Sequence, residues 1–224
     1  MSEENLRKDA ARNRERLLAA GREVFARRGL SATLNDVAHH AGVGVGTAYR
    51  RFANKEQLID AIAVQQTDEL EAILHEALAE EDGGAGLELY LERSLAVQTR
   101  DRGMAQILSG RHLRTEQHDE DRRRLAPLVD EVAERARRDG ALREDVTGTD
   151  LILLQVALTS VADVVEEGAP ISGREDLPEL YRRYLRIVLD GLRAEPAGTS
   201  PLPVPPLTVQ QTHDLLGRPR PEPA

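Results

Sequence analysis

Side chains that donate hydrogen bonds to anions gather in a short stretch between residues 45 and 55. The hydroxyl-bearing and cationic members of this stretch are Thr47, Tyr49, Arg50, Arg51 and Lys55. Guanidinium and ammonium groups neutralise phosphate oxygens, and guanidinium groups also bind base edges in the grooves of duplex nucleic acid. The residue types in this stretch therefore predict a surface that binds nucleic acid.

Two short helices joined by a glycine turn would position these side chains. Thr33 can cap a helix whose third residue, Asp36, completes a capping box, and a glycine follows that helix. A second helix is expected over about residues 45–52, with Ala48 and Phe52 four residues apart on its inward face. This pattern is typical of a helix-turn-helix, whose second helix enters the major groove of DNA.

The flanking segments supply the rest of a small domain. Residues 14–28 carry apolar side chains at helical spacing and are followed by Gly29, which predicts a supporting helix. Asn54 is a plausible N-cap for a long helix that begins near Lys55. The sequence thus predicts a three-helix head followed by a long connecting helix.

The segment ATLNDVAHHAGVGVGTAYRRFANKEQL, residues 32–58, resembles the signature of the TetR family of bacterial transcriptional regulators. The similarity covers about residues 10–60, and the rest of the chain resembles the family only in layout. The resemblance implies that Thr47, Tyr49 and Lys55 contact phosphate groups. The resemblance also implies that Asn35, Val45, Gly46, Arg50 and Arg51 face bases or the adjacent backbone, and we expect Thr33 among the DNA-binding residues as well.

Two positions depart from the family's usual pattern. Gly44 replaces the hydroxyl residue often found at the start of the recognition helix, and Val45 stands where many members carry a polar side chain. Because Val45 cannot hydrogen-bond a base, we expect a thymine methyl contact at most, with more specificity from Asn35, Arg50 and DNA shape. The alternatives are that Tyr49 packs on the core of the head and that the two consecutive arginines are solvated charges.

Charge is distributed unevenly along the chain. Residues 1–52 carry ten Lys or Arg and six Asp or Glu, a net charge of +4, whereas the whole chain carries −9 and the remainder therefore −13. A basic head can approach a phosphate backbone while an acidic body resists indiscriminate coating by nucleic acid. The chain has no Cys, residues 1–16 show no secretory pattern, and no segment reads as a membrane span. We therefore expect a cytoplasmic protein without a membrane partner.

Helical patterns continue beyond the head, and no convincing pair of strands is found. Glycines interrupt the chain at residues 83–86, and Pro127 should produce a kink or a helix start near Leu125. The further helices are expected at about residues 87–100, 118–138, 147–167 and 176–193. The sequence therefore predicts an all-α fold of about nine helices.

Three parts of the chain differ in character. They are a helix-turn-helix DNA-binding domain over residues 1–55, a helical effector-binding and dimerisation domain over 56–194, and a Pro-rich tail over 195–224. Eight of the eleven prolines lie in the tail, which favours disorder, although residues 208–216 could form a transient helix.

Two copies of the head would be needed to recognise a palindromic site, because one head offers few contacts. Apolar residues at three- or four-residue spacing in the last two predicted helices could form the interface of a homodimer. These residues are Leu151, Leu154, Leu158, Val161, Val165, Leu180, Tyr184 and Ile187. The alternative for the same pattern is an intramolecular core.

The resemblance also implies that the body holds a small-molecule effector and that the protein is a repressor released from DNA by that effector. Candidate pocket residues are Tyr90, Gln98, Met104, Ile107, His112 and Asp163, each of which could instead be ordinary core or surface. An aromatic content of 3% without Trp favours an aliphatic or mixed pocket. The alternative is a DNA-binding regulator or architectural protein without an effector.

An enzyme is disfavoured. The chain has no cysteine nucleophile, and His112, His118 and the acidic residues 119–121 match no strong metal-ligand spacing. The alternating glycines from 42 to 46 follow a helix, whereas a dinucleotide-binding loop follows a strand. We therefore expect no catalytic site, no metal and no cofactor.

Overall fold

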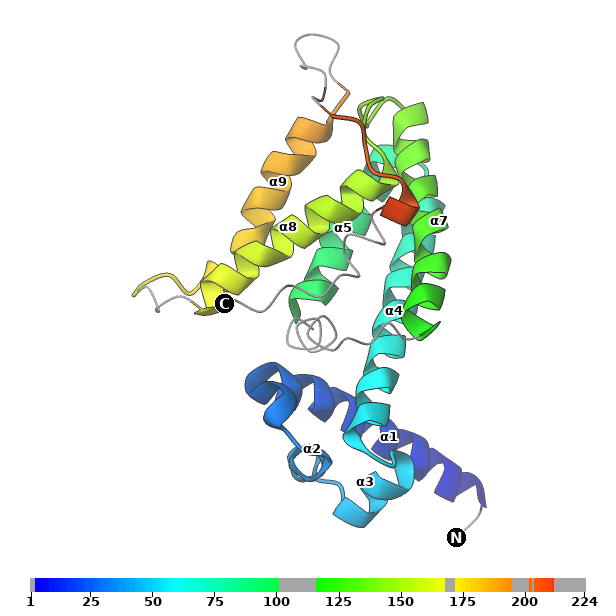
Figure 1. Cartoon of the computed structure of the whole chain (residues 1–224), viewed down its shortest axis with the longest axis vertical. Helices are drawn as coiled ribbons and strands as arrows, with labels where there is room; N and C mark the ends of the chain where they lie inside the picture. Colours follow the sequence, from blue (N-terminus) through cyan, green and yellow to red (C-terminus); the bar gives the residue numbers. More distant parts are fainter. Residues whose placement is uncertain (1–2, 101–115, 168–171, 195–201, 203, 212–224) are drawn as a thin grey trace. The chain divides into compact units, whose positions relative to one another are not determined.

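The computed structural model describes residues 3–100, 116–167, 172–194, 202 and 204–211 (Figure 1). Every regular element within these ranges is a helix, which confirms the predicted all-α fold. The chain divides into two compact units, with the change from the first to the second between Thr67 and Asp68, inside one continuous helix. The domain boundary expected after residue 55 lies within the first unit.

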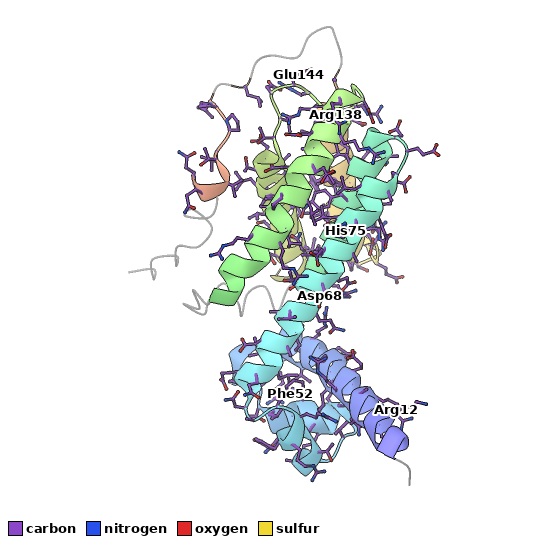
Figure 2. The ribbon with its side chains drawn as sticks, turned by 90° about the vertical axis from the view of Figure 1, so that its right-hand side faces the viewer. Arg12, Phe52, Asp68, His75, Arg138 and Glu144 are labelled. Atoms are coloured by element: carbon purple, nitrogen blue, oxygen red, sulfur yellow. The ribbon has the colours of Figure 1, made fainter. Side chains whose placement is uncertain are left out.

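The first unit contains three complete helices and the start of a fourth. They are α1 (Glu3–Arg28), a 3-10 turn (Gly29–Ser31), α2 (Leu34–Ala41), α3 (Val45–Arg51) and the first turns of α4 (Lys55–Ala79). Its core includes Phe25 of α1, Val37 of α2 and Ile59 of α4, together with Phe52, the residue that follows α3 (Figure 2). Side chains from all four helices thus share one buried core.

Helix α1 begins earlier than the residue pattern predicts, at Glu3 rather than near Arg14. Its last four turns bury Leu17, Leu18 and Phe25 completely, and these residues carried the prediction. The earlier turns are rich in charged residues, which form helices well but show no apolar periodicity. The turns of α1 before Arg14 therefore could not be predicted from apolar spacing.

The second unit contains the remainder of α4, α5 (Gly83–Arg100), α7 (Glu116–Arg138), α8 (Gly148–Glu167), a 3-10 turn (Leu177–Glu179) and α9 (Leu180–Leu192). Helix α7 packs on α5 and α8, and α8 also packs on α5 and α9 (Figure 1). Helix α7 runs through Pro127, so a helix start near Leu125 was wrong. The core of this unit is a single cluster of mostly aliphatic side chains.

Helix α5 begins at Gly83, four residues before its predicted start. Asp82 caps it by accepting a hydrogen bond from the Ala85 N–H at 2.7 Å, and Asp139, the residue after α7, accepts one from the Gly83 N–H at 2.9 Å. A Cβ at Gly86 would collide with the carbonyl oxygen of Ala77 at the end of α4. These glycines allow α5 to begin in close contact with its neighbours, because no side chain separates the backbones.

Helix α8 opens with the predicted capping pair, since the Asp150 carboxylate accepts from the Thr147 N–H at 2.8 Å and from its hydroxyl at 2.7 Å. The 18-residue window Gly148–Val165 has a mean hydropathy of 1.5, which is enough by length and composition to cross a membrane. Leu151 and Leu158 of this window are buried in the core of the second unit. We interpret α8 as a core helix.

Part of the Pro-rich tail contacts the second unit. The Thr149 hydroxyl donates to the carbonyl oxygen of Leu207 at 2.7 Å, and the backbone of Leu202 hydrogen-bonds the Asp145 carboxylate. The backbone N–H of Thr208 donates to the Gln211 side chain at 2.9 Å at the start of a short helical stretch, residues 209–211. Leu202 and Leu207 thus contact the helical body, whereas we expected a disordered tail. Residues 195–201, 203 and 212–224 of the tail lie outside the described ranges.

Candidate nucleic-acid interface and helical body

The start of α2 is fixed by the capping box that the sequence predicts. The Asp36 N–H donates to the Thr33 hydroxyl oxygen at 3.2 Å, and the Asp36 carboxylate accepts from the Thr33 N–H at 2.8 Å. Arg28 at the end of α1 pairs with the same carboxylate at 2.8 Å. Hydrogen bonds from Thr33, followed by Arg28, lower the pKa of Asp36 to about 2. The carboxylate therefore stays ionised and stabilises the amino end of the helix.

Gly42 makes the turn between α2 and α3. Its φ of 60° is in the left-handed region, which L-residues with a side chain adopt reluctantly. Arg16 of α1 donates to the carbonyl oxygens of Ala41 and Gly42 at 2.6 and 3.3 Å. The turn between the two helices is therefore stabilised by the left-handed conformation of Gly42 and by the hydrogen bonds from Arg16.

Helix α3 has one buried face and one exposed face. Ala48 is fully buried, whereas Arg50 and Arg51 are exposed and Tyr49 retains 48% exposure. Tyr49 therefore does not pack in the core of the head, which was the alternative for this residue. Arg50 donates to the Thr47 hydroxyl at 2.9 Å, so two of the predicted DNA-contacting side chains lie together.

The junction between α3 and α4 is also capped. The Asn54 side chain accepts from the Gln57 N–H at 2.9 Å, and the Gln57 side chain accepts from the Ala53 N–H at 2.9 Å. Lys55 reaches the carbonyl oxygen of Ala32, just before α2, at 3.5 Å. Lys55 is therefore near the amino end of α2 as well as at the start of α4.

The structure places all nine predicted DNA-contacting residues in the first unit. Six are exposed, namely Thr33, Asn35, Gly46, Tyr49, Arg50 and Arg51, and three are partly buried, namely Val45, Thr47 and Lys55. Val45 packs against the core of the head, and a Cβ added at Gly46 would meet no atom within 4 Å. The amino end of α3 thus presents a small, open backbone surface next to hydrogen-bonding side chains.

The predicted pocket residues are only partly brought together. Tyr90 and Gln98 lie on α5, and Gln98 donates to the Gln155 side chain of α8 at 2.5 Å. Asp163 is partly buried on α8. The other three candidates, Met104, Ile107 and His112, lie outside the described residues.

Sequence reasoning missed two buried polar residues, Ser94 and Gln155. Ser94 is 0% exposed and lies one helical turn from both Tyr90 and Gln98, and Gln155 is 4% exposed. The spacing of residues 90, 94 and 98 places them on one face of α5. That spacing was the available signal, but it indicates burial only when combined with the apolar residues that surround it.

The predicted dimer stripe mixes core and surface positions. Leu151 and Leu158 are buried within the chain, which fits the alternative of an intramolecular core for these two residues. Leu154 and Val161 also pack against the core, and Val165 and Leu180 are partly buried. Tyr184 and Ile187 of α9 are exposed at 43% and 57%. The exposed apolar residues that the prediction omitted on α8 are Val156 and Val164.

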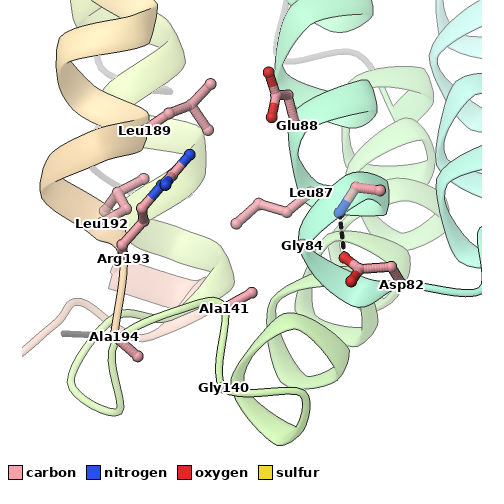
Figure 3. A pocket seen from close by; sticks show the side chains of 11 residues that line it. Asp82, Gly84, Leu87, Glu88, Gly140, Ala141, Leu189, Leu192, Arg193 and Ala194 are labelled. Carbon is pink, nitrogen blue, oxygen red and sulfur yellow. Dashed lines mark hydrogen bonds between the residues drawn. The ribbon is translucent and has the colours of Figure 1, made fainter. Parts of the chain in front are cut away.

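An open cleft of about 680 Å³ lies at one end of the second unit (Figure 3). The start of α5, the loop after α7 and the end of α9 form it, and Glu88, Arg193 and Leu192 are among its lining side chains. The three predicted pocket residues that the structure describes, Tyr90, Gln98 and Asp163, do not line this cleft. Within the described residues no cluster of three or more potential metal ligands is present, and the side chains of His112 and His118 lie outside them.

Two family models match the chain. Residues 17–62 match a model described as bacterial regulatory proteins, tetR family. Residues 82–194 match a model described as the C-terminal domain of SbtR-like transcriptional regulators. The two models together span both structural units, and the second ends where the Pro-rich tail begins.

Individual relatives are similar over most of their length. The transcriptional repressor KstR2 of Rhodococcus jostii is 29% identical, covering 80% of this chain and 90% of its own. The regulator UidR of Escherichia coli is 26% identical, covering 73% and 87%. A crystal structure of a TetR transcription regulatory protein from Mycobacterium vanbaalenii is 28% identical with a TM-score of 0.62, covering 84% of this chain and 99% of that one.

Proposed function

The chain belongs to the TetR family of bacterial transcriptional regulators, and from this premise we propose that it is a homodimeric repressor of palindromic operators. A small molecule that binds the helical body releases the repressor from its operator. The single observation that carries the DNA-binding step is the exposed face of α3, where Gly46, Tyr49 and Arg51 are open while Ala48 is buried. The protein acts in the cytoplasm, where its DNA is.

In the proposed complex, α3 lies in the major groove with its amino end toward the base edges. Val45 and Gly46 approach the bases, and Asn35 and Arg50 supply hydrogen bonds to bases or the adjacent backbone. Thr47, Tyr49 and Lys55 hold phosphate groups, and Arg51 and Thr33 lie at the edge of the same contact. The net charge of +4 in residues 1–52 attracts the duplex before these contacts form.

Exposed apolar side chains on the last two helices support the homodimer. Val156 and Val164 of α8 and Tyr184 and Ile187 of α9 expose 43 to 72% of their surface in the single chain. Burying such residues against a two-fold related copy would form an isologous interface. Two heads then reach successive major grooves about 34–36 Å apart.

Release by an effector requires differential affinity. A ligand weakens operator binding only if it binds more tightly to a body conformation whose two heads no longer match the groove spacing. Helix α4 contributes residues to both units, so a change in the second unit can be transmitted covalently to the first. Polar groups buried between α5 and α8 support the presence of a ligand site in the body.

Binding to the DNA upstream of the protein's own gene tests the docking. Fluorescence anisotropy over a salt series should show weaker binding for Tyr49→Phe, Lys55→Ala and Arg51→Ala than for the wild type. Loss of one cationic phosphate contact, as in Lys55→Ala, should reduce the slope of log affinity against log salt by about 0.9. Arg138→Ala, at an exposed arginine of α7 (Figure 2), is the matched control and should bind like the wild type. Unchanged binding in all three head variants would refute the docking.

A further inference from the structure

Two facing helices bury a group of uncharged polar side chains in the second unit. Tyr90, Ser94 and Gln98 follow one another at four-residue spacing on α5, so they share one face of that helix. Gln155 of α8 lies opposite them and accepts a hydrogen bond from Gln98 at 2.5 Å. We call these four residues the α5–α8 polar cluster.

The cluster is buried but incompletely hydrogen-bonded. Tyr90 and Gln155 are each 4% exposed and Ser94 is 0% exposed. The hydroxyl oxygen of Ser94 has no hydrogen-bond partner among the described residues. The amide nitrogen of Gln155 has none of standard geometry, although the Gln155 side chain lies within reach of the Tyr90 phenol. A polar atom removed from water without a partner destabilises the folded state, so apolar residues of similar size would be more favourable here. Because Gln155 bonds Gln98 on the α5 face that also carries Ser94, one bound molecule can complete both groups.

All four side chains of the cluster are neutral. Ser94 contributes a hydroxyl, Gln98 and Gln155 contribute carboxamides, and burial raises the pKa of Tyr90 so that its phenol stays protonated. The surrounding core is aliphatic, with Leu91, Leu95 and Leu158 in the same cluster of buried side chains. A charged group placed here would lose its hydration without gaining an ion-pair partner from these four residues.

We propose that the α5–α8 polar cluster anchors an uncharged carbonyl or hydroxyl group carried on an apolar skeleton, with Ser94 and Gln155 as the specificity-determining residues. This inference rests on the proposed function, because the bound molecule is the effector that releases the repressor. The Gln155 amide nitrogen donates to the oxygen of the ligand. The Ser94 hydroxyl can donate to the same oxygen or accept from a ligand hydroxyl. Asp163 lies two turns further along α8, about 12 Å in helical rise from Gln155.

A matched set of probes on one skeleton tests the chemical class. Menthone and menthol carry a neutral carbonyl and a neutral hydroxyl, p-menthane carries no polar group, and menthylamine carries a positive charge. At saturating concentration the two neutral polar probes should raise the Tm of the wild-type protein by about 2–5 °C. The hydrocarbon and the amine should leave it unchanged. No shift with menthone and menthol, or an equal shift with p-menthane or menthylamine, would overturn the proposal.

Three variants locate the binding. Gln155→Leu and Ser94→Ala should each weaken menthone binding about tenfold, because each removes one hydrogen-bond partner. Ser160→Ala, at an exposed serine of α8, should not change it. Without a probe, Ser94→Ala should unfold at the wild-type Tm or higher, whereas Gln155→Leu should lower the Tm because it also removes the acceptor of the Gln98 amide. A lower Tm for Ser94→Ala, with menthone binding retained, would show that the cluster only holds structural water, and would reject the anchor.

Operator binding is measured separately in the same variants. The cluster variants without a probe should bind the DNA upstream of their own gene as tightly as the wild type. If the wild type itself fails to bind DNA, the proposed function fails whatever the probes do. If DNA binding is intact but the probes give no selective shift, only the inferred anchor fails.

Discussion

The carboxylate of Asp36 accepts two hydrogen bonds from Thr33, one from the backbone N–H at 2.8 Å and one from the hydroxyl at 2.6 Å. The same carboxylate pairs with Arg28 at the end of α1. One side chain therefore connects the end of the supporting helix with the beginning of α2. The position of α3 depends on this connection, since only the turn at Gly42 and its neighbours separates α2 from α3.

We predict that this contact makes stability depend on pH in the acid range. Because folding lowers the pKa of Asp36 to about 2, its ionised form stabilises the fold above the unfolded-state pKa of about 4. That contribution is lost as the pH falls from about 4 to about 2. Thermal unfolding measured across this range should show a smaller decrease for Asp36→Asn than for the wild type. An NMR titration placing the Asp36 midpoint near 4 would contradict the prediction.

Gly46 is a position where helix stability and DNA binding favour different residues. A Cβ at this exposed position meets no atom within 4 Å, so Gly46→Ala should raise helix stability by about 0.5–1 kcal/mol. The same methyl group should obstruct approach to the base edges and weaken operator binding about tenfold or more. Urea unfolding and fluorescence anisotropy measure the two effects. Gly191→Ala, at an open glycine of α9, controls for the added methyl group in the DNA-binding measurement. Unaltered operator affinity in Gly46→Ala would place this residue away from DNA.

The head could be predicted in detail because its signals are local. Thr33 and Asp36 are three residues apart, and Ala48 and Phe52 are one helical turn apart. Gly42 can by itself adopt the left-handed conformation that the turn requires. The body could not be predicted as fully. An apolar residue on α8 can face the core of its own chain, as Leu151 does, or the surface, as Val156 does, and the spacing alone does not distinguish the two. Only the neighbouring helices decide which side of α8 faces the core.

The proposed dimer surface gives a contrast between two variants. Ile187 is 57% exposed, so Ile187→Glu should leave the single chain folded but raise the dimer dissociation constant about a hundredfold or more, since the two-fold axis repeats each buried charge. Leu151→Ala should instead destabilise the fold itself by about 2–5 kcal/mol. Sedimentation equilibrium measures the first effect and urea unfolding the second. Val209→Glu, at an exposed valine of the tail, is the control for added charge and should remain a dimer. A fully dimeric Ile187→Glu protein would place the interface elsewhere.

Arg135 of α7 holds the chain where α4 ends. Its guanidinium group donates to the carbonyl oxygens of Leu78, Glu80 and Glu81, the last at 3.2 Å. Carbonyls at a helix end lack partners within the helix, so Arg135→Ala should leave them without donors and reduce the free energy of unfolding by about 2–3 kcal/mol.

Two further variants separate this role from a general effect of positive charge. Arg138→Ala removes an exposed arginine from the same helix and should change stability by less than about 0.5 kcal/mol. Arg135→Lys keeps the charge but lacks the planar fork that spans several carbonyls, so it should restore only part of the loss. Urea unfolding of the three variants measures the differences. Equal stability of Arg135→Ala and Arg138→Ala would mean that water satisfies these carbonyls as well as Arg135 does.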